Sequence, residues 1–320
     1  MAFLAPCPTL PGAEPASSLP VLETSRRIWD EAPHNAFTDL IRHGDQWLCV
    51  FREGKGHVSP DGAIRVIASP DGQVWKSKAR LTHPQADLRD PKITLAPNGD
   101  LFLTGAAAWH QPNPARHLTL AWRSKDGISW GEPVAIGDTN IWLWRVTAHH
   151  QTLWSVGYGT AGNKLTRLYR CDEGGTFEPW VPTLFDMGYP NETGLHVLPD
   201  ETMFCLLRRD EAPHTGLLGR SRPPYRDWTW TDLGMRIGGP NFLVLPDGRA
   251  HAVVRFYDGK VRTSLCALDL QKGTLTEQLA LPSGGDTSYA GMAWHGERLW
   301  ISYYSSHEGK TAIYLAVVRL

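Results

Sequence analysis

The chain has 320 residues, of which 32 are basic and 33 are acidic, and no basic run appears along it. This balance argues against nucleic acid or an anionic membrane as a partner. No apolar stretch approaches the roughly 20 residues that a membrane-spanning helix needs. Five cysteines, odd in number and without paired spacing, predict buried reduced thiols and no disulfides.

The first twenty residues are rich in proline, alanine and serine, and they lack a basic segment and a sustained apolar core. They do not fit a signal peptide, so we expect a flexible arm over residues 1–20 and a cytoplasmic protein. A secreted chain trimmed of its leader would have the same sequence. A strand is predicted over Val21–Trp29, and residues 21–320 are expected to form one domain.

A β-hairpin pattern recurs along the rest of the chain: an apolar strand, a polar turn and a second apolar strand. Its copies are Phe37–Glu53, Pro91–Ala107, Arg145–Tyr158, Glu192–Arg208, Asn241–Phe256 and Tyr289–Tyr304. Successive turns are 54, 52, 50, 47 and 49 residues apart, centred on Gly44, Asn98, His150, Asp200, Asp247 and Gly296. A period of about 50 residues built from hairpins predicts an all-β fold, a six-bladed β-propeller of four-stranded antiparallel blades.

A third strand is expected after each hairpin. The innermost strands of a propeller all run in the same direction, so their ends meet at one mouth of the central channel, where residues far apart in sequence can face one ligand. The expected third strands are Ala63–Ala68, Leu118–Arg123, Thr166–Cys171, Thr215–Arg220, Val261–Leu268 and Ala312–Val318.

Two of these third strands are followed by the pattern S-x-D-G-x-x-W, at Ser69–Trp75 and Ser124–Trp130, and Cys171–Phe177 is a degenerate copy. An aspartate can accept backbone N–H bonds in a tight turn, glycine supplies a positive φ, and the aromatic ring packs the turn onto the sheet. The pattern therefore predicts a structural role.

These turns resemble the Asp-box (BNR) repeat, and with the hairpins they make residues from about 25 to 320 similar to the six-bladed sialidase (neuraminidase) superfamily, as a divergent member. The resemblance implies an exo-acting, retaining hydrolase of acidic sugars. Sialidases use a tyrosine nucleophile, since an attacking carboxylate would be repelled by the carboxylate on the substrate's anomeric carbon.

The resemblance also implies roles for particular strand ends. Glu192 and Arg208 lie at opposite ends of the fourth hairpin, as the family's glutamate and arginine do, and Tyr289 opens the sixth, where the family has its nucleophile. We expect Tyr289 to attack and Glu192 to take its proton. The family's acid/base carboxylate lies in the loop that follows Arg52, where His57 and Asp61 are the candidates.

The first arginine of the family's triad is missing, because the first hairpin begins with Asn35-Ala36-Phe37-Thr38. Arg89 is the candidate substitute, and Arg255 and Arg262 compete for the third arginine position. A guanidinium group suits a substrate carboxylate because it binds in a bidentate way. Asp286 is a spare catalytic carboxylate, and the other candidate substrate-binding residues at the expected mouth are Arg52, Glu53, Asp90, Arg145, Arg208 and His307.

Thirteen histidines are present without an HExxH motif or a comparable cluster, so the sequence predicts neither a metal nor a cofactor. The leading hypothesis is a hydrolase of an acidic glycan such as a sialoside, with no obligatory protein partner. One alternative is a hydrolase or lyase of uronic-acid-containing glycans, with His57 and Tyr289 as base and acid. The other is a non-catalytic propeller that binds a glycan or a protein.

Overall fold

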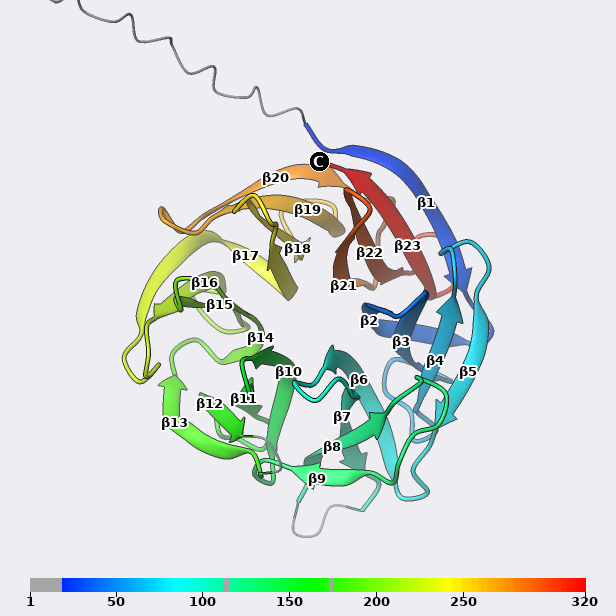
Figure 1. Ribbon diagram of the computed structural model, residues 1–320, viewed down its shortest axis with the longest axis horizontal. Helices are drawn as coiled ribbons and strands as arrows, with labels where there is room; N and C mark the ends of the chain where they lie inside the picture. The colour runs from blue at the N-terminus through cyan, green and yellow to red at the C-terminus, as the bar shows by residue number, and fades with distance from the viewer. Residues whose placement is uncertain (1–18, 112–114, 173–174) are drawn as a thin grey trace, which may run out of the picture.

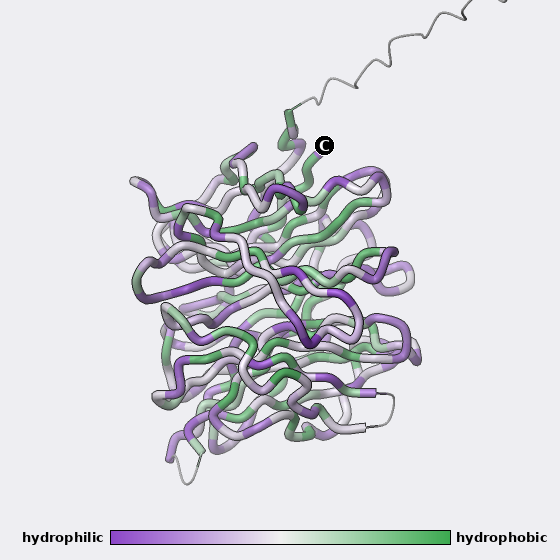
Figure 2. The backbone as a smooth tube through the Cα atoms, turned by 90° about the vertical axis from the view of Figure 1, so that its left-hand side faces the viewer, coloured by the Kyte–Doolittle hydropathy of each residue, from purple (hydrophilic) through white to green (hydrophobic). Residues whose placement is uncertain are grey.

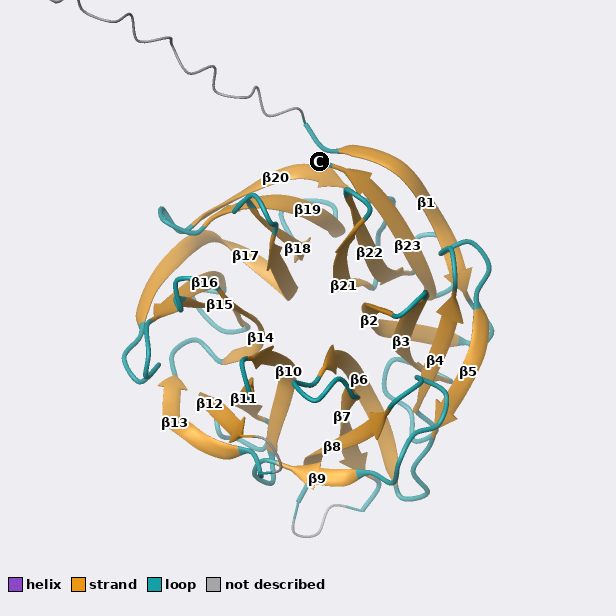
Figure 3. Ribbon diagram, viewed as in Figure 1, coloured by secondary structure: helices purple, strands orange, loops and turns teal. Residues whose placement is uncertain are grey.

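The computed structural model describes residues 19–111, 115–172 and 175–320. This part of the chain consists of antiparallel strands and loops arranged around a central axis (Figures 1 and 3). Over the described ranges, no helix is long and apolar enough to cross a membrane. The expected arm lies almost entirely outside the described residues. The all-β class predicted from the sequence is confirmed.

Hydrogen bonding groups the strands into five sheets. The first contains β2 (His34–His43), β3 (Gln46–Gly54), β4 (Ala63–Ser69) and β5 (Lys76–Leu81). The second contains β6 (Ala86–Leu95), β7 (Leu101–Trp109), β8 (His117–Ser124) and β9 (Val134–Ile136). The third contains β10 (Ile141–His149), β11 (Thr152–Gly159), β12 (Thr166–Asp172) and β13 (Glu178–Phe185).

A seven-stranded sheet follows where two separate four-stranded blades were expected. Its long strand β17 pairs with β16 through its first half and with β18 through its second half. The chain stays extended here, whereas a loop separates the outer strand of each preceding sheet from the next inner strand, so two four-stranded groups share β17. The strands are β14 (Pro190–Val197), β15 (Met203–Arg209), β16 (Thr215–Ser221), β17 (Thr229–Val244), β18 (Ala250–Phe256), β19 (Arg262–Asp269) and β20 (Thr274–Ala280).

The last sheet joins the two ends of the described chain. It contains β21 (Thr287–His295), β22 (Arg298–Ser305), β23 (Ala312–Arg319) and β1 (Val21–Trp29). β1 runs antiparallel to β23, from Val21 opposite Arg319 to Trp29 opposite Ile313. The blue and red ends of the ribbon therefore lie side by side, and this pairing closes the ring of sheets (Figure 1).

The strands differ in burial according to their distance from the axis. β2, β6, β10, β14, the second half of β17 and β21 lie nearest the axis, and strands such as β5 and β13 lie at the periphery (Figure 1). The inner strands are largely buried and the peripheral ones largely exposed. Apolar stretches follow the strands, and hydrophilic residues gather in many of the turns at the edges (Figure 2). Four cysteines are buried and free, as predicted, and Cys7 lies outside the described residues.

A register shift interrupts every inner strand at the same level. In each case two residues of the inner strand oppose one residue of its neighbour, which is the geometry of a β-bulge. The shift turns the backbone so that the side chains at this level leave the regular alternation of the sheet. The two inner-strand residues at each bulge are Phe37-Thr38, Asp90-Pro91, Trp144-Arg145, Asn191-Glu192, Gly239-Pro240 and Tyr289-Ala290.

The S-x-D-G-x-x-W turns connect neighbouring sheets. Asp71 Oδ1 accepts the backbone N–H of Gln73 at 2.8 Å, and Ser69 Oγ accepts that of Gly72 at 2.9 Å. Gly72 has a φ of +73°, and a Cβ placed on it would lie 2.5 Å from the ring of Trp300 in β22. The turn of the first sheet thus packs against the last sheet, which requires a residue without a side chain.

We expect Gly72→Ala to lower the free energy of unfolding, because the new methyl group would clash with Trp300. Gly44→Ala is the matched control, since Gly44 also has a positive φ (+52°) but nothing lies within 4 Å of its Cβ position. Overpacking typically costs about 1–3 kcal/mol, so Gly72→Ala should lose about that much more than Gly44→Ala in chemical denaturation. Equal losses would contradict the steric explanation.

Candidate active site

The bulges of β14 and β21 bring Glu192 and Tyr289 together from separate sheets. The Tyr289 hydroxyl donates a hydrogen bond to Glu192 Oε1 at 2.5 Å. Arg208, at the end of β15, places Nη1 2.6 Å from the same carboxylate oxygen and 3.2 Å from the Tyr289 hydroxyl. The backbone N–H of Gly239 donates to the other oxygen, Glu192 Oε2, at 3.0 Å. The carboxylate is therefore fixed against the phenol.

The surroundings of Tyr289 oppose the ionisation of its hydroxyl. Burial and the nearby charge of Glu192 raise the pKa of Tyr289 well above that of an ordinary phenol, although Arg208 and Arg255 act in the opposite direction. The resting state is a neutral phenol bonded to a carboxylate. Such a pair can form a nucleophile with the carboxylate as base.

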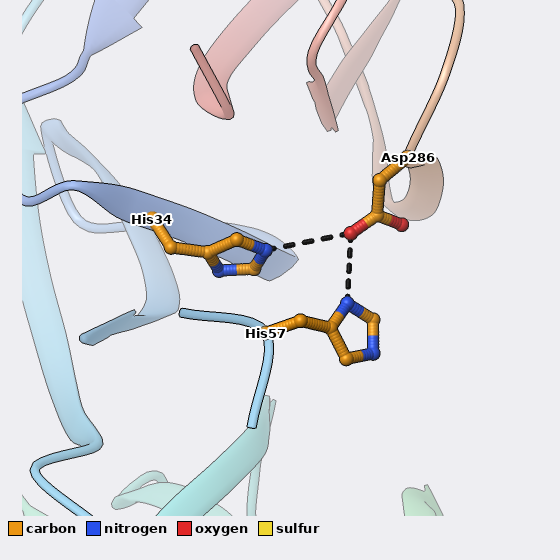
Figure 4. Close-up of side chains that lie close together, drawn as sticks. All are labelled: His34, His57 and Asp286. Atoms are coloured by element: carbon orange, nitrogen blue, oxygen red, sulfur yellow. Dashed lines mark hydrogen bonds and ion pairs between the residues drawn. The ribbon is translucent and has the colours of Figure 1, made fainter. Parts of the chain in front are cut away.

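A second group of side chains surrounds Asp286, which directly precedes β21. The carboxylate oxygen Oδ2 lies 2.8 Å from Nδ1 of His57 and 3.4 Å from Nε2 of His34, so both rings point at one atom (Figure 4). The other oxygen, Oδ1, accepts a hydrogen bond from the Tyr304 hydroxyl at 2.7 Å. Burial raises the pKa of Asp286, but the hydrogen bonds from His34, His57 and Tyr304 outweigh it and hold the pKa below its ordinary value.

The two groups share a wall. The ring of Phe37, at the bulge of β2, packs edge-on against His57 at 5.0 Å and against Tyr289 at 5.1 Å between centroids. The guanidinium of Arg255 lies 5.3 Å from the centroid of the Tyr289 ring, and its Nη2 donates to Tyr304 at 2.8 Å. The structure therefore brings Tyr289, Glu192, Arg208, Arg255, Asp286 and His57 into one region.

Asp90 and Arg89 come from the bulge region of β6. Asp90 is buried with a φ of +46°, and its Oδ1 has no hydrogen-bond partner among the described residues. Burial raises the pKa of Asp90, with Arg89 and Lys92 opposing that shift. The guanidinium of Arg89 lies 5.9 Å from the ring centroids of both Phe37 and Trp142, and its Nη2 donates to the carbonyl of His57 at 3.4 Å.

Other residues expected at the mouth have structural partners elsewhere. Arg52 is fully buried: its Nε donates to Asp87 at 2.9 Å, and its remaining nitrogens bind the loop at Gly56 and Ser59. Glu53, the next residue, points to the outer strands, where its Oε1 lies 2.7 Å from Arg65 and 2.6 Å from Arg80. Arg52 therefore holds the loop after β3 in place, and Glu53 links the outer strands β4 and β5.

Asp61, Arg145 and His307 have partners other than the Tyr289 hydroxyl, although Arg145 Nη2 donates to the carbonyl of Ala290, the residue after Tyr289, at 3.3 Å. Asp61 is exposed and accepts the backbone N–H of Lys55 at 3.3 Å. Arg145 Nη1 donates to Asp39 at 2.7 Å. His307 is exposed and its Nδ1 lies 2.9 Å from Ser305 Oγ.

Several residues around the site were not among the sequence candidates. His34 and Tyr304 hold Asp286, Lys92 is buried with its ammonium 4.9 Å from the ring centroid of Trp144, and Asp39 binds Arg145. Burial and the nearby Arg145 lower the pKa of Lys92 to about 8. Two of these residues could have been found from the strand pattern. His34 is the first residue of β2 and Tyr304 is the next-to-last residue of β22, so both lie at the mouth end of their sheets.

Comparisons with known proteins extend the description of the fold. No protein family model matches the chain, and no curated protein matches it in sequence. A protein of unknown function from Dyadobacter fermentans has a similar structure, with a TM-score of 0.83, 19% identity, and coverage of 94% of this chain and 99% of that one.

Two glycoside hydrolases are also similar in structure. The α-L-arabinanase of Penicillium chrysogenum has a TM-score of 0.71 at 14% identity, over 93% of this chain and 98% of that one. The sialidase of Trypanosoma rangeli has a TM-score of 0.69 at 12% identity, over 90% of this chain and 54% of the sialidase chain. At these identities the likeness concerns the fold, which is the sialidase-like propeller that both glycosidases have.

Asp90 should make stability depend on pH in an unusual direction. Because the pKa of Asp90 is raised in the folded protein, its contribution to stability is greatest below the unfolded pKa of about 3.9. That contribution is lost as pH rises through the folded pKa. We expect Asp90→Asn to unfold at a higher temperature than the wild type at pH 7, with the difference disappearing towards pH 4. Asparagine also tolerates the positive φ.

Asp61→Asn is the control with the opposite sign. Burial raises the pKa of Asp61, but the hydrogen bonds from Ser59 and the backbone of Lys55 outweigh it and lower the pKa, so the contribution of Asp61 to stability is present above the unfolded pKa and is lost as pH falls. That variant should be slightly less stable than the wild type at pH 7. An Asp90→Asn protein that is less stable at pH 7 would contradict the assignment.

Proposed function

We propose that this protein is a retaining glycoside hydrolase with Tyr289 as nucleophile and Glu192 as its base. The observation that carries the proposal is the 2.5 Å hydrogen bond between the two, with Arg208 bound to both. The fold shared with an arabinanase and a sialidase supports a glycosidase. We further propose that the propeller has six blades, with the two halves of β17 counted in different blades.

In the first step the Tyr289 oxygen attacks the anomeric carbon while its proton passes to Glu192. The glycosidic C–O bond breaks, and the departing oxygen takes a proton from the acid/base residue. In the second step water attacks the same carbon and gives a proton to the acid/base residue. The bond to Tyr289 breaks, and the phenol recovers its proton from Glu192.

We assign the acid/base role to His57 in preference to Asp61. Its Nδ1 is held by Asp286, so the ring is oriented with Nε2 directed away from that carboxylate. Asp61 is occupied by the backbone of its own loop. Next to this loop, a cavity of about 270 Å³ is lined by residues including Ser59, Arg89 and Trp109. This cavity has room for the leaving group of a glycoside.

Two classes of substrate remain candidates, and a different observation favours each. An acidic sugar, as expected from the sequence, is favoured by Arg89, whose nearest carboxylate (Asp87) is 3.9 Å away and already bound to Arg52. An uncharged sugar is favoured by Phe37 in place of the first triad arginine and by the internal pairing of Arg208 and Arg255. The Penicillium enzyme, whose structure holds arabinobiose, illustrates the uncharged class.

We expect the wild type to hydrolyse at least one member of a panel of aryl α-sialosides, α-uronides and α-L-arabinofuranosides. Tyr289→Phe removes the nucleophile and Glu192→Gln removes its base, so kcat should fall by about 10²- to 10⁴-fold in the base variant. A 2-fluoro glycosyl fluoride of the preferred sugar should label the peptide that contains Tyr289, as detected by mass spectrometry.

Tyr314→Phe is the matched control. Its hydroxyl also donates to a glutamate, Glu308, at 2.8 Å, but the pair lies in β23 and in the turn that precedes it, and Tyr314 packs in a different core cluster from Tyr289. This variant should keep wild-type activity. Full activity in Tyr289→Phe would refute the proposed nucleophile, and binding of glycans on an array without any turnover would favour the non-catalytic alternative.

A further inference from the structure

Three side chains with metal-binding atoms converge beside the Tyr289–Glu192 pair. His34 begins β2, His57 lies in the loop after β3, and Asp286 precedes β21. His34 Nε2, His57 Nδ1 and Asp286 Oδ2 all lie within 4.8 Å of one another. Figure 4 shows the two imidazole rings approaching the carboxylate from different strands and loops.

We propose that His34, His57 and Asp286 bind a divalent transition-metal ion of the zinc type. Two imidazole nitrogens and one carboxylate oxygen are a donor set that suits such an ion better than Mg²⁺ or Ca²⁺, which prefer oxygen ligands. The atoms are close enough that small side-chain rotations would bring each to the usual distance of about 2.0–2.2 Å from one ion. The sequence predicted no metal because Asp286 is 229 residues from His57, so no ligand spacing was visible.

The surroundings of Asp286 orient it for this role. Its Oδ1 is held by the Tyr304 hydroxyl at 2.7 Å and lies 3.4 Å from Arg255 Nη2, so Oδ2 is directed towards the histidines. Partners of this kind fix a ligating group and raise metal affinity. His34 Nε2 now lies 3.4 Å from Asp286 Oδ2, whereas His34 Nδ1 has no hydrogen-bond partner among the described residues, so the ring proton can move to Nδ1 when Nε2 gives its lone pair to an ion.

The site also has an entry path and an open position. His34 is nearly buried, whereas the side chain of His57 is 50% exposed. Three protein ligands leave a fourth position of a tetrahedral ion open, an arrangement typical of sites that bind water or substrate. A dication held by one carboxylate keeps a positive charge, so it would attract a sugar hydroxyl or carboxylate; this last step rests on the proposed function. Because the ion would take His57 Nδ1 and Asp286 Oδ2 as ligands, the acid/base role proposed for His57 applies to the protein without the ion.

The test is the binding of Zn²⁺ to untagged full-length protein, measured by isothermal titration calorimetry and by metal analysis after dialysis. We expect one ion per chain at this site, with Mg²⁺ not competing, and loss of that ion in His34→Gln and Asp286→Asn. Tyr304→Phe removes the partner of Oδ1, so its affinity should fall by about 10- to 100-fold. Co²⁺ should give the visible absorption of a four-coordinate nitrogen and oxygen site.

The matched control uses the other group of this kind, which is formed by His149, His150 and Glu201 at the turns after β10 and β14. His149→Gln should leave the ion at Asp286 in place, and circular dichroism checks that each variant is folded. Zn²⁺ binding that survives Asp286→Asn, or that disappears only in His149→Gln, would overturn the proposal, as would no binding in the wild type. If Zn²⁺ binds as proposed but the metal-free protein hydrolyses no glycoside, the metal site stands and the proposed function fails.

Discussion

The geometry of the site depends on the bulges in the inner strands. In a regular antiparallel pair, successive side chains alternate between the two faces of a sheet. Two residues opposing one break this alternation, so that Glu192 and Tyr289, 97 residues apart in sequence, meet at 2.5 Å. Tyr289 has a φ of +53°, a conformation that costs an ordinary residue about 1–2 kcal/mol. The ladders on both sides of the bulge sustain this cost, and Phe37 and Asp90 have a positive φ at the same position of their bulges.

The same geometry requires a closed ring. Asp286 directly precedes β21 in the sheet whose outermost strand is β1, and its partners His34 and His57 belong to the first sheet and the loop after β3. The pairing of β1 with β23 therefore fixes the cluster around Asp286, although β1 itself contributes no residue to it. Turns such as that at Gly72, which packs against Trp300, add contacts between the first and last sheets. Separation of the first and last sheets would remove the contact of His57 with Asp286, because these two residues lie on opposite sides of that junction. The contact of Tyr289 with Glu192 would remain, because Glu192 lies in the seven-stranded sheet.

The sequence predicted those features that depend on local alternation. The hairpins, the third strands and the strand Val21–Trp29 lie where the apolar pattern put them, because each buried strand carries its own signal. The peripheral strands β5 and β13 are exposed or half-buried at nearly every position and carry no clear apolar alternation, and the unbroken course of β17 depends on pairing with two neighbours, so neither feature could be predicted. Within the site, the meeting of Tyr289 and Glu192 was anticipated from a resemblance. The roles of His34 and Arg52 were not, since both are set by contacts with distant loops.

Burial also changes what the arginines imply. Several arginines were expected to bind a substrate carboxylate at the mouth of the channel, and an unpaired buried cation is costly. The fold meets that cost internally: Arg208 is bound by Glu192, Arg255 by Asp286, and Arg145 by Asp39. A guest carboxylate would have to compete with these anions, so the number of arginines says little about the charge of the substrate. What matters is the charge left over after internal pairing, and beside Phe37, which packs against Tyr289, that charge includes Arg89. Discrimination between an acidic and an uncharged sugar should therefore depend on Arg89 and on whatever occupies the His34–His57–Asp286 cluster, and not on the arginines that bind Glu192 and Asp286.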